Sequence, residues 1–196
     1  MENESYQSEE MERFARRVEF LEDPERRGDI SPAELLNLLP IKKDDNILDL
    51  GAGAGYFTIP TAKAVERGTV FAVDIDPNML EVVQSKAKKE LLSNIQTLEG
   101  SVDAIPLSEN SIDFVLVSLV LHELKPLLPA SLQEIKRVLK PDGTLVCMEF
   151  EAEEIPTHPH PRISSASMTQ EIKKAGLAVT QKFFPTDKTY IITAQK

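Results

Sequence analysis

The sequence is poor in cysteine, tryptophan and positive charge. A single cysteine, Cys147, stands in an apolar run, and none of the 196 residues is tryptophan. One cysteine excludes a disulfide framework and a cysteine-rich metal site. The 22 lysines and arginines are outnumbered by 32 aspartates and glutamates, which gives a formal net charge of −10. This charge balance argues against nucleic acid as a partner, because a surface that follows phosphates is usually basic.

Long apolar runs are also missing. No run approaches the roughly 18–20 residues that cross a bilayer. The first residues, MENESYQSEEMERF, are acidic and polar, the reverse of a secretory signal. Hydrophobic residues still make up 41% of the chain, enough for the core of one ordinary domain. We therefore expect a soluble cytoplasmic protein with no membrane partner, either a monomer or a homodimer.

Between residues 46 and 150, apolar runs alternate with amphipathic segments. Short apolar, β-branched runs predict five strands, at 46–50, 69–75, 95–100, 111–120 and 144–150. Amphipathic spacing predicts three helices, at 56–67, 77–90 and 130–140, the last ended by the sequence PDG. Because the strands are apolar throughout, they are typical of a parallel sheet with helices on both faces, an α/β fold.

The two ends of the chain add helices and a hairpin. Residues 5–22 predict an amphipathic helix that packs on another part of the protein, and SPAE at 31–34 is a capped helix start. Near the other end, a helix around 168–175 precedes strands at 177–184 and 189–195. The PTDK linker between these strands is too short for a crossover helix, so they must be antiparallel.

A glycine-rich turn, ILDLGAGAGYFT (47–58), follows the first predicted strand. Gly51, Gly53 and Gly55 let a backbone turn tightly and approach a ligand, although a plain structural turn also explains them. The dinucleotide pattern needs glycine at position 56, where Tyr56 stands. Asp49 would repel a pyrophosphate and attract a cation. The pattern therefore favours S-adenosylmethionine, which joins an adenosine to an ammonium and a sulfonium, unless Asp49 only braces the loop.

A second acid, Asp74, ends the next predicted strand about 20 residues further on. A carboxylate at this place can accept hydrogen bonds from ribose hydroxyls. Met79, one turn into the following helix, can pack on an adenine. Asp76 is instead expected to cap that helix, with Pro77 at its first position.

Four segments together resemble a known family. ILDLGAGAGYFT, VFAVDIDPNML, IPLSENSIDFVLVSLVLHEL and EIKRVLKPDGTLVCMEF are similar to the successive motifs of class I S-adenosylmethionine-dependent methyltransferases. They are most similar to the small bacterial branch near the ubiquinone/menaquinone and arsenite methyltransferases, and the likeness covers about 30–196. It implies a Rossmann-like, seven-stranded sheet of order 3-2-1-4-5-7-6 with strand 7 antiparallel. It implies a methyltransferase domain at 31–196. The segment before it, 1–30, is then expected to be a lid over the pocket, with a plain packing helix as the equal alternative.

The resemblance also implies which residues bind the cofactor. The methionine end would contact Asp49, Gly51, Ala52, Gly53 and Gly55, the adenosine Asp74, Ile75 and Met79, and the sulfonium end Ser118 and Leu119.

One block departs from the family pattern. Ser101 stands where an aspartate normally contacts the adenine amino group, so either Ser101 or Asp103 takes that role. The Val102 backbone N–H can serve the adenine ring whatever its side chain is.

Methyl transfer from a sulfonium is an in-line displacement with an activated leaving group, so alignment and exclusion of water matter most. A base is needed only if the acceptor must lose a proton. On the acceptor side the candidate catalytic residues are His122, Arg162, Tyr56 and Tyr190, with Glu123 beside His122. His122 could equally be a hydrogen-bonded structural histidine.

Two further sites are disfavoured. The HPHP run with His158 and His160 lacks ligands that would complete a metal site, so we expect no metal. Arsenite methylation needs several cysteine thiolates in the related branch, and Cys147 is alone. The sequence therefore predicts methyl transfer to a small molecule. The alternatives are a protein or RNA methyltransferase, a non-catalytic cofactor-binding subunit and, least favoured, a nicotinamide dehydrogenase.

Overall fold

A computed structural model describes residues 2–23, 30–153 and 162–196, with side chains from residue 9 onward. Its seven strands form one sheet of order β3-β2-β1-β4-β5-β7-β6, which confirms the predicted topology. The strands are β1 (Ile47–Leu50), β2 (Val70–Asp74), β3 (Ile95–Glu99), β4 (Ile112–Ser118), β5 (Leu139–Phe150), β6 (Ala178–Phe183) and β7 (Thr189–Gln195). Only β7 runs against its neighbours, pairing antiparallel with both β5 and β6.

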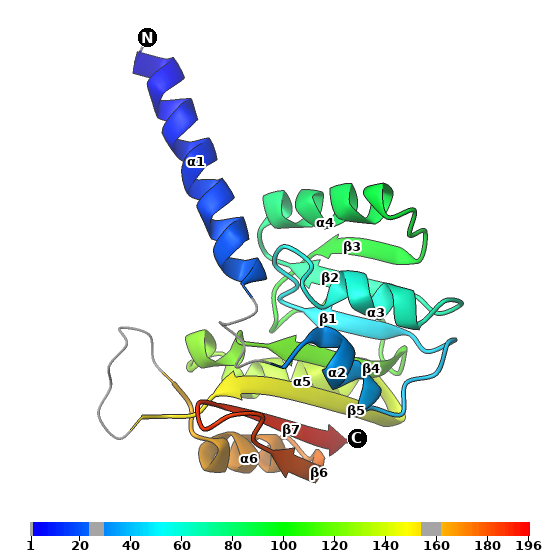
Figure 1. Ribbon diagram of the computed structural model, residues 1–196. Helices are drawn as coiled ribbons and strands as arrows, with labels where there is room; N and C mark the ends of the chain where they lie inside the picture. Colours follow the sequence, from blue (N-terminus) through cyan, green and yellow to red (C-terminus); the bar gives the residue numbers. More distant parts are fainter. Residues whose placement is uncertain (1, 24–29, 154–161) are drawn as a thin grey trace.

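Helices cover both faces of this sheet (Figure 1). They are α1 (Glu2–Glu22), α2 (Pro32–Asn37), α3 (Thr58–Ala64), α4 (Pro77–Lys89), the 3₁₀ helix η2 (Leu121–Leu124), α5 (Leu128–Val138) and α6 (Ser165–Lys174). Buried residues of α5 and α6 pack in one core with β4 and β5, whereas α2 and α3 belong to a second core. None of the described helices is long and apolar enough to span a membrane.

Local capping rules explain where two helices begin. Ser31 accepts a hydrogen bond from the Glu34 N–H, and the Glu34 carboxylate accepts one from the Ser31 N–H, which is a complete capping box for α2. Asp76 caps α4 by accepting from the Asn78 N–H at 3.0 Å, with Pro77 at the first helical position. Both caps agree with the sequence predictions.

The fifth strand starts earlier than expected. The prediction placed a helix over 130–140 and a strand only from 144, but α5 ends at Val138 and β5 begins at Leu139. The register against β4 shifts between Ile112 and Phe114, which face Leu139 and Thr144. Asp142 takes a left-handed φ of 64° inside this irregularity. A bulge tolerates a proline that has no N–H to donate, so Pro141 lies within the strand and does not end the helix.

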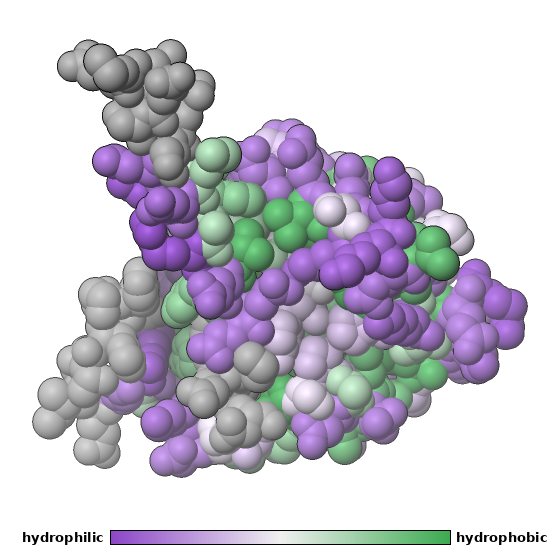
Figure 2. Space-filling view, turned by 45° about the horizontal axis from the view of Figure 1, so that its top comes forward, coloured by the Kyte–Doolittle hydropathy of each residue, from purple (hydrophilic) through white to green (hydrophobic). Residues whose placement is uncertain are grey.

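The first helix projects away from the sheet at the N-terminal end of the chain (Figure 1), and its last turns are held by charged contacts. Arg17 donates to the Asp76 carboxylate at 2.8 Å. Lys86 of α4 contacts the Glu22 carboxylate and also donates to the Ala54 carbonyl at 2.7 Å. These contacts fasten the end of α1 to the cap of α4 at Asp76 and to its last turn at Lys86, which also joins α4 to the glycine loop. Apolar surface gathers alongside this part of α1 in Figure 2.

Candidate active site

A cavity with a volume of about 800 Å³ opens at the carboxyl ends of the central strands. Its walls come from the loop after β1, the ends of β2, β4 and β5, and the last turns of α1. This is the point at which the strand order reverses, between β1 and β4. Open α/β sheets bind their ligands at such a point. The volume falls within the range of small-molecule sites.

The glycine loop forms one wall and adopts backbone angles that side chains disfavour. Gly51, Gly53 and Gly55 have φ values of +73°, +51° and +87°. A Cβ on Gly51 would stand 2.5 Å from a methyl of Val120, whereas a Cβ on Gly53 would lie 3.4 Å from Leu21. Gly51 and Gly53 line the cavity together with Ala52, but Gly55 does not. The first glycine is therefore required both by its angle and by the space around it.

Asp74 supports this loop while facing the cavity. One carboxylate oxygen accepts from the Gly53 N–H at 2.7 Å and the other from the Asp76 N–H at 2.9 Å. Each carboxylate oxygen retains a further lone pair for a ligand. Ile75 beside it also lines the cavity and is largely exposed. The predicted ribose-binding acid is thus held in a fixed position by two backbone groups.

Asp49 and Met79 are predicted cofactor residues that, like Gly55 and Asp103, do not line the cavity. Asp49 is 3% exposed, and its carboxylate accepts from the Thr58 hydroxyl at 2.6 Å. Met79 is fully buried. The expected place of Asp49 at the mouth of the loop therefore does not match its burial. Its contact with Thr58 fits the alternative of a loop-bracing acid, and its electrostatic effect on a cofactor remains a prediction.

The third cofactor segment combines two candidates in one contact. The Ser101 hydroxyl hydrogen-bonds the Asp103 carboxylate, and Ser101 and Val102 line the cavity while Asp103 does not. Asp103 can therefore orient Ser101.

At the end of β4, Ser118 and Leu119 also line the cavity. Leu119 has a left-handed φ of 57°, and its N–H donates to the Met148 carbonyl at 2.9 Å. Such strain in a branched residue is typical of functional sites.

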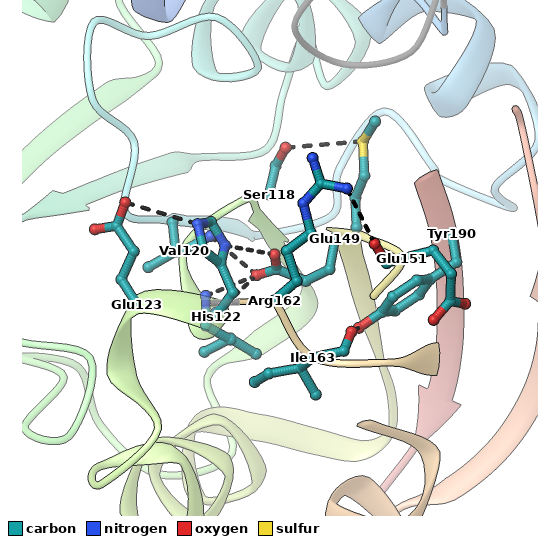
Figure 3. A network of polar contacts seen from close by, with 11 residues as sticks. Ser118, Val120, His122, Glu123, Glu149, Glu151, Arg162, Ile163 and Tyr190 are labelled. Atoms are coloured by element: carbon teal, nitrogen blue, oxygen red, sulfur yellow. Dashed lines mark hydrogen bonds and ion pairs between the residues drawn. The ribbon is translucent and has the colours of Figure 1, made fainter. Parts of the chain in front are cut away.

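The opposite wall contains a buried acid beside His122 (Figure 3). Glu149 of β5 is 0% exposed. One of its oxygens accepts from the backbone N–H groups of Val120, Leu121 and His122 at 3.0, 2.7 and 3.3 Å. The other oxygen lies 2.7 Å from Nδ1 of His122. His122 itself lines the cavity and is 4% exposed.

An aromatic and a guanidinium complete this wall. The Arg162 guanidinium lies over the Phe150 ring, 5.1 Å from its centroid, and donates to Glu153 at 2.6 Å. Both Arg162 and Phe150 line the cavity, as do Tyr56 and Lys188. The structure thus brings Tyr56, His122 and Arg162 to one cavity, and their role toward an acceptor stays a prediction.

Tyr190 does not reach this cavity. It is fully buried in β7 and donates to the Ile163 carbonyl at 2.9 Å. Burial is the largest cause that raises the pKa of its hydroxyl well above the usual range. A hydroxyl in this position braces the chain ahead of α6 and does not face an acceptor. The expectation of Tyr190 on the substrate side is therefore not supported by its placement.

Sequence reasoning missed several residues of the cavity. Phe150 was read only as the end of a strand, and Arg17, Phe20, Leu21 and Lys188 were not selected. Glu149, which contacts His122 but does not line the cavity, was also read only as part of that strand. A charged residue at the end of an otherwise apolar strand was the available signal for Glu149. His158 and His160 lie outside the described residues. Within the described ranges no group of three or more possible metal ligands occurs.

Comparisons with known proteins agree with this geometry. The family model "Methyltransferase domain" matches residues 48–147, about half of the chain. A solved structure, a SAM dependent methyltransferase from Aquifex aeolicus, is 29% identical with a TM-score of 0.81, covering 91% of this chain and 96% of that one. The chain therefore belongs to the methyltransferase domain family, in the class that depends on S-adenosylmethionine.

Curated relatives place it near the quinone methyltransferases. A demethylmenaquinone methyltransferase from Staphylococcus carnosus is 35% identical over 123 residues, covering 62% of this chain and 50% of that protein. One from Lactococcus lactis is 37% identical over 114 residues, covering 58% and 45%. The chain spans about half the length of these curated relatives.

The cavity fits the cofactor that the family implies. Asp74 offers a fixed carboxylate to a ribose, and the Ser101–Val102 segment offers a hydroxyl and a backbone to an adenine. The backbone of Gly51 to Gly53 lines the cavity without side chains at 51 and 53, so a methionine portion can approach it closely. These residues form one continuous wall of the cavity.

Proposed function

We propose that the protein transfers a methyl group from S-adenosylmethionine to a small-molecule acceptor by in-line displacement. The observation that carries this proposal is one cavity with two unlike ends. The glycine loop and Asp74 lie at one end, and His122, Phe150 and Arg162 lie at the other. A cofactor at the first end would present its methyl group toward the second.

The nature of the second end supports a small, partly apolar acceptor. Phe20, Leu124 and Phe150 supply apolar surface, and Tyr56 adds a further ring. Basic residues also line it, but Arg17 pairs with Asp76 and Arg162 with Glu153, which leaves little positive charge for a nucleic acid. The curated relatives are named as demethylmenaquinone methyltransferases, so a quinol is the first acceptor to test.

The residues of the cavity would act mainly by positioning. The cofactor supplies an activated methyl carbon on sulfur. When the acceptor attacks, the carbon–sulfur bond breaks and the sulfur keeps the electron pair as a neutral thioether. Asp74 and the loop backbone hold the nucleoside, while the apolar walls align the acceptor and exclude water. Tyr56 and Arg162 are proposed acceptor contacts.

Residues 1–30 are proposed to act as a lid over this cavity. Arg17, Phe20 and Leu21 of α1 contribute to its wall, and Arg17 and Glu22 hold the helix against α4. The rest of the chain, 31–196, would then be the catalytic domain. We further propose a cytoplasmic protein, monomeric or homodimeric. Its one cysteine, Cys147, is buried and free, as is usual in a reducing compartment.

Calorimetry with S-adenosylhomocysteine, followed by transfer of labelled methyl to demethylmenaquinone and to a panel of catechols and amines, tests this proposal. We expect micromolar binding and label in a small product. Binding without transfer to any acceptor would favour a non-catalytic subunit. Label in RNA or protein would favour a macromolecular acceptor. The proposal would be overturned if the folded protein gave no heat of binding with S-adenosylhomocysteine or with S-adenosylmethionine.

A further inference from the structure

We propose that Glu149 is a positioning residue that fixes the tautomer of His122, so that Nε2 of His122 accepts a proton from the methyl acceptor. This inference rests on the proposed function and deepens it, because it assigns the cavity to acceptors that carry a proton on the attacking group. His122 then has a chemical role rather than only a structural one.

The hydrogen bonds around Glu149 determine where the imidazole hydrogen lies. Three backbone N–H groups point at one carboxylate oxygen, and Nδ1 of His122 lies 2.7 Å from the other (Figure 3). Hydrogen bonds to the charged form favour an ionised carboxylate, which can only accept. Nδ1 must therefore donate to Glu149, and in the neutral ring Nε2 is left with a free lone pair.

The position of the ring directs that lone pair toward the cavity. The Nδ1 edge of His122 faces Glu149, which is fully buried, so the opposite edge is the part that can line the cavity. The Phe150 ring packs edge-on at 6.3 Å between centroids and keeps the imidazole in place. His122 thus meets the cavity beside the residues proposed to hold the acceptor.

Several charged groups act on this nitrogen. The Glu123 carboxylate of η2 lies 3.7 Å from Nε2, too far for a hydrogen bond but close enough to stabilise an imidazolium. Glu149 faces Nδ1 from β5. Arg162, ahead of α6, and Lys188, ahead of β7, line the same cavity with opposite sign.

The proposed step balances as follows. The acceptor atom attacks the methyl carbon, a bond forms between them, and the carbon–sulfur bond breaks with its electrons remaining on sulfur. The proton on the acceptor moves to Nε2 of His122, which becomes an imidazolium held by Glu149. Release of that proton to water restores the enzyme. No oxidant or reductant is required.

A cap on η2 is the simpler role that Glu149 could have, since it accepts all three N–H groups at the start of this helix. A cap requires neither a particular tautomer nor a cavity-facing histidine. The two roles therefore differ in what Glu149→Gln does to the imidazole. A glutamine can still accept with its oxygen, but its amide would donate to Nδ1 and move the ring hydrogen to Nε2.

Nitrogen NMR of the imidazole groups in the full chain tests this difference without acceptor or cofactor. The chain has three histidines, and the spectrum of His122→Gln assigns the signals of His122. At pH 8 we expect Nδ1 protonated and Nε2 unprotonated in the wild type, and the reverse in Glu149→Gln. A wild-type His122 ring protonated at Nε2, or at both nitrogens at this pH, would overturn the proposal whatever Glu149→Gln shows.

Kinetics with whichever acceptor the labelling panel identifies provides the second test. We expect His122→Gln to lower kcat by roughly 10²- to 10⁴-fold, the usual contribution of a general base. Glu149→Gln should lower kcat at least about tenfold with little change in KM, and the double variant should be no slower than His122→Gln alone.

Asp113→Asn is the matched control, because Asp113 also accepts from a backbone N–H and from a cation but lies at the amino end of β4. It should lower stability without changing the His122 signals or kcat. S-adenosylhomocysteine binding should stay intact in all variants. A wild-type protein that does not bind S-adenosylhomocysteine would refute the proposed function. Wild-type binding and methyl transfer, with an unchanged rate in Glu149→Gln, would refute only this inference.

Discussion

The two ends of the cavity are built in different ways. The cofactor end comes from residues that follow β1, β2 and β4, and its form depends on backbone angles and on hydrogen bonds such as that from Gly53 to Asp74. The acceptor end is assembled from side chains of α1, η2, the end of β5 and the chain before α6. Backbone geometry tolerates little change, whereas a wall of side chains can change its specificity one residue at a time.

Gly51→Ala should have the largest effect on cofactor affinity, because it changes the backbone of the glycine loop at the cofactor end of the cavity. A left-handed alanine costs roughly 1–3 kcal/mol of stability, and its Cβ would meet Val120 at 2.5 Å. We expect S-adenosylhomocysteine to bind about 100-fold more weakly by calorimetry, or about 2.8 kcal/mol. Val120→Ala in the same chain should restore part of the affinity.

Gly176→Ala is the control that separates the effect of backbone strain on stability from damage to the cofactor site. Gly176 has a φ of +80°, and the nearest atom to a Cβ there is the flexible end of Lys136, away from the cavity. This variant should lose stability to a similar degree and keep cofactor affinity. Equal loss of cofactor affinity in Gly51→Ala and Gly176→Ala would mean that the loss comes from lower stability and not from damage to the cofactor end of the cavity.

Asp49→Asn should have the next effect and tests whether the buried acid acts through its charge. S-adenosylmethionine carries a sulfonium and the homocysteine product a neutral thioether. If the Asp49 charge stabilises the cation, the substitution should weaken binding of the methylated form by roughly tenfold, about 1.4 kcal/mol, and that of the product less.

Thr58→Val is the control for this measurement, because it removes the 2.6 Å hydrogen bond to Asp49 but keeps the charge. It should change both affinities alike. An unchanged ratio of the two affinities in Asp49→Asn would show that Asp49 only braces the loop.

Arg162→Met tests the acceptor end of the cavity, where removal of one side chain should lower kcat/KM only moderately. Loss of the guanidinium over Phe150 should cost about 0.5–2 kcal/mol, seen as a roughly 2- to 30-fold fall in kcat/KM for the acceptor. Cofactor affinity should not change. Lys182→Met removes a similar contact, 5.7 Å from the Phe184 centroid, outside the cavity. An equal fall in rate for both variants would contradict the assignment of Arg162.

Arg17→Ala should have the smallest effect, because it breaks an ion pair that is partly exposed on the Arg17 side. Such pairs contribute less than about 1 kcal/mol. We expect a loss of S-adenosylhomocysteine affinity of less than about fivefold that disappears at high salt. Arg16→Ala, which breaks an exposed pair with Glu12 within α1, should change nothing. A salt-independent loss would show that Arg17 contacts the ligand.

The same contrast explains what the sequence could predict. The sheet order, the glycine loop, Asp74 and the caps of α2 and α4 follow local rules or known motifs, and the structure places them as expected. The predicted start of β5 was wrong because Pro141 was taken as the end of the preceding helix. Pairing with β4 instead starts the strand at Leu139, two residues before this proline.

The acceptor end was less predictable. Glu149 can be fully buried because N–H groups from a segment 27 to 29 residues earlier donate hydrogen bonds to its carboxylate. Tyr190 was placed by resemblance, but all of β7 except its last residue is buried. Such outcomes depend on long-range packing, which no local pattern contains.

The single carboxylate of Glu149 also joins two segments that lie far apart in the sequence. Three successive amides, those of Val120, Leu121 and His122, donate to it from the turn that begins η2. Their hydrogens can exchange with solvent only when the turn separates from β5. Slow exchange at these amides would therefore measure how rarely this wall of the cavity opens, and ligands that enter against it should slow that exchange further.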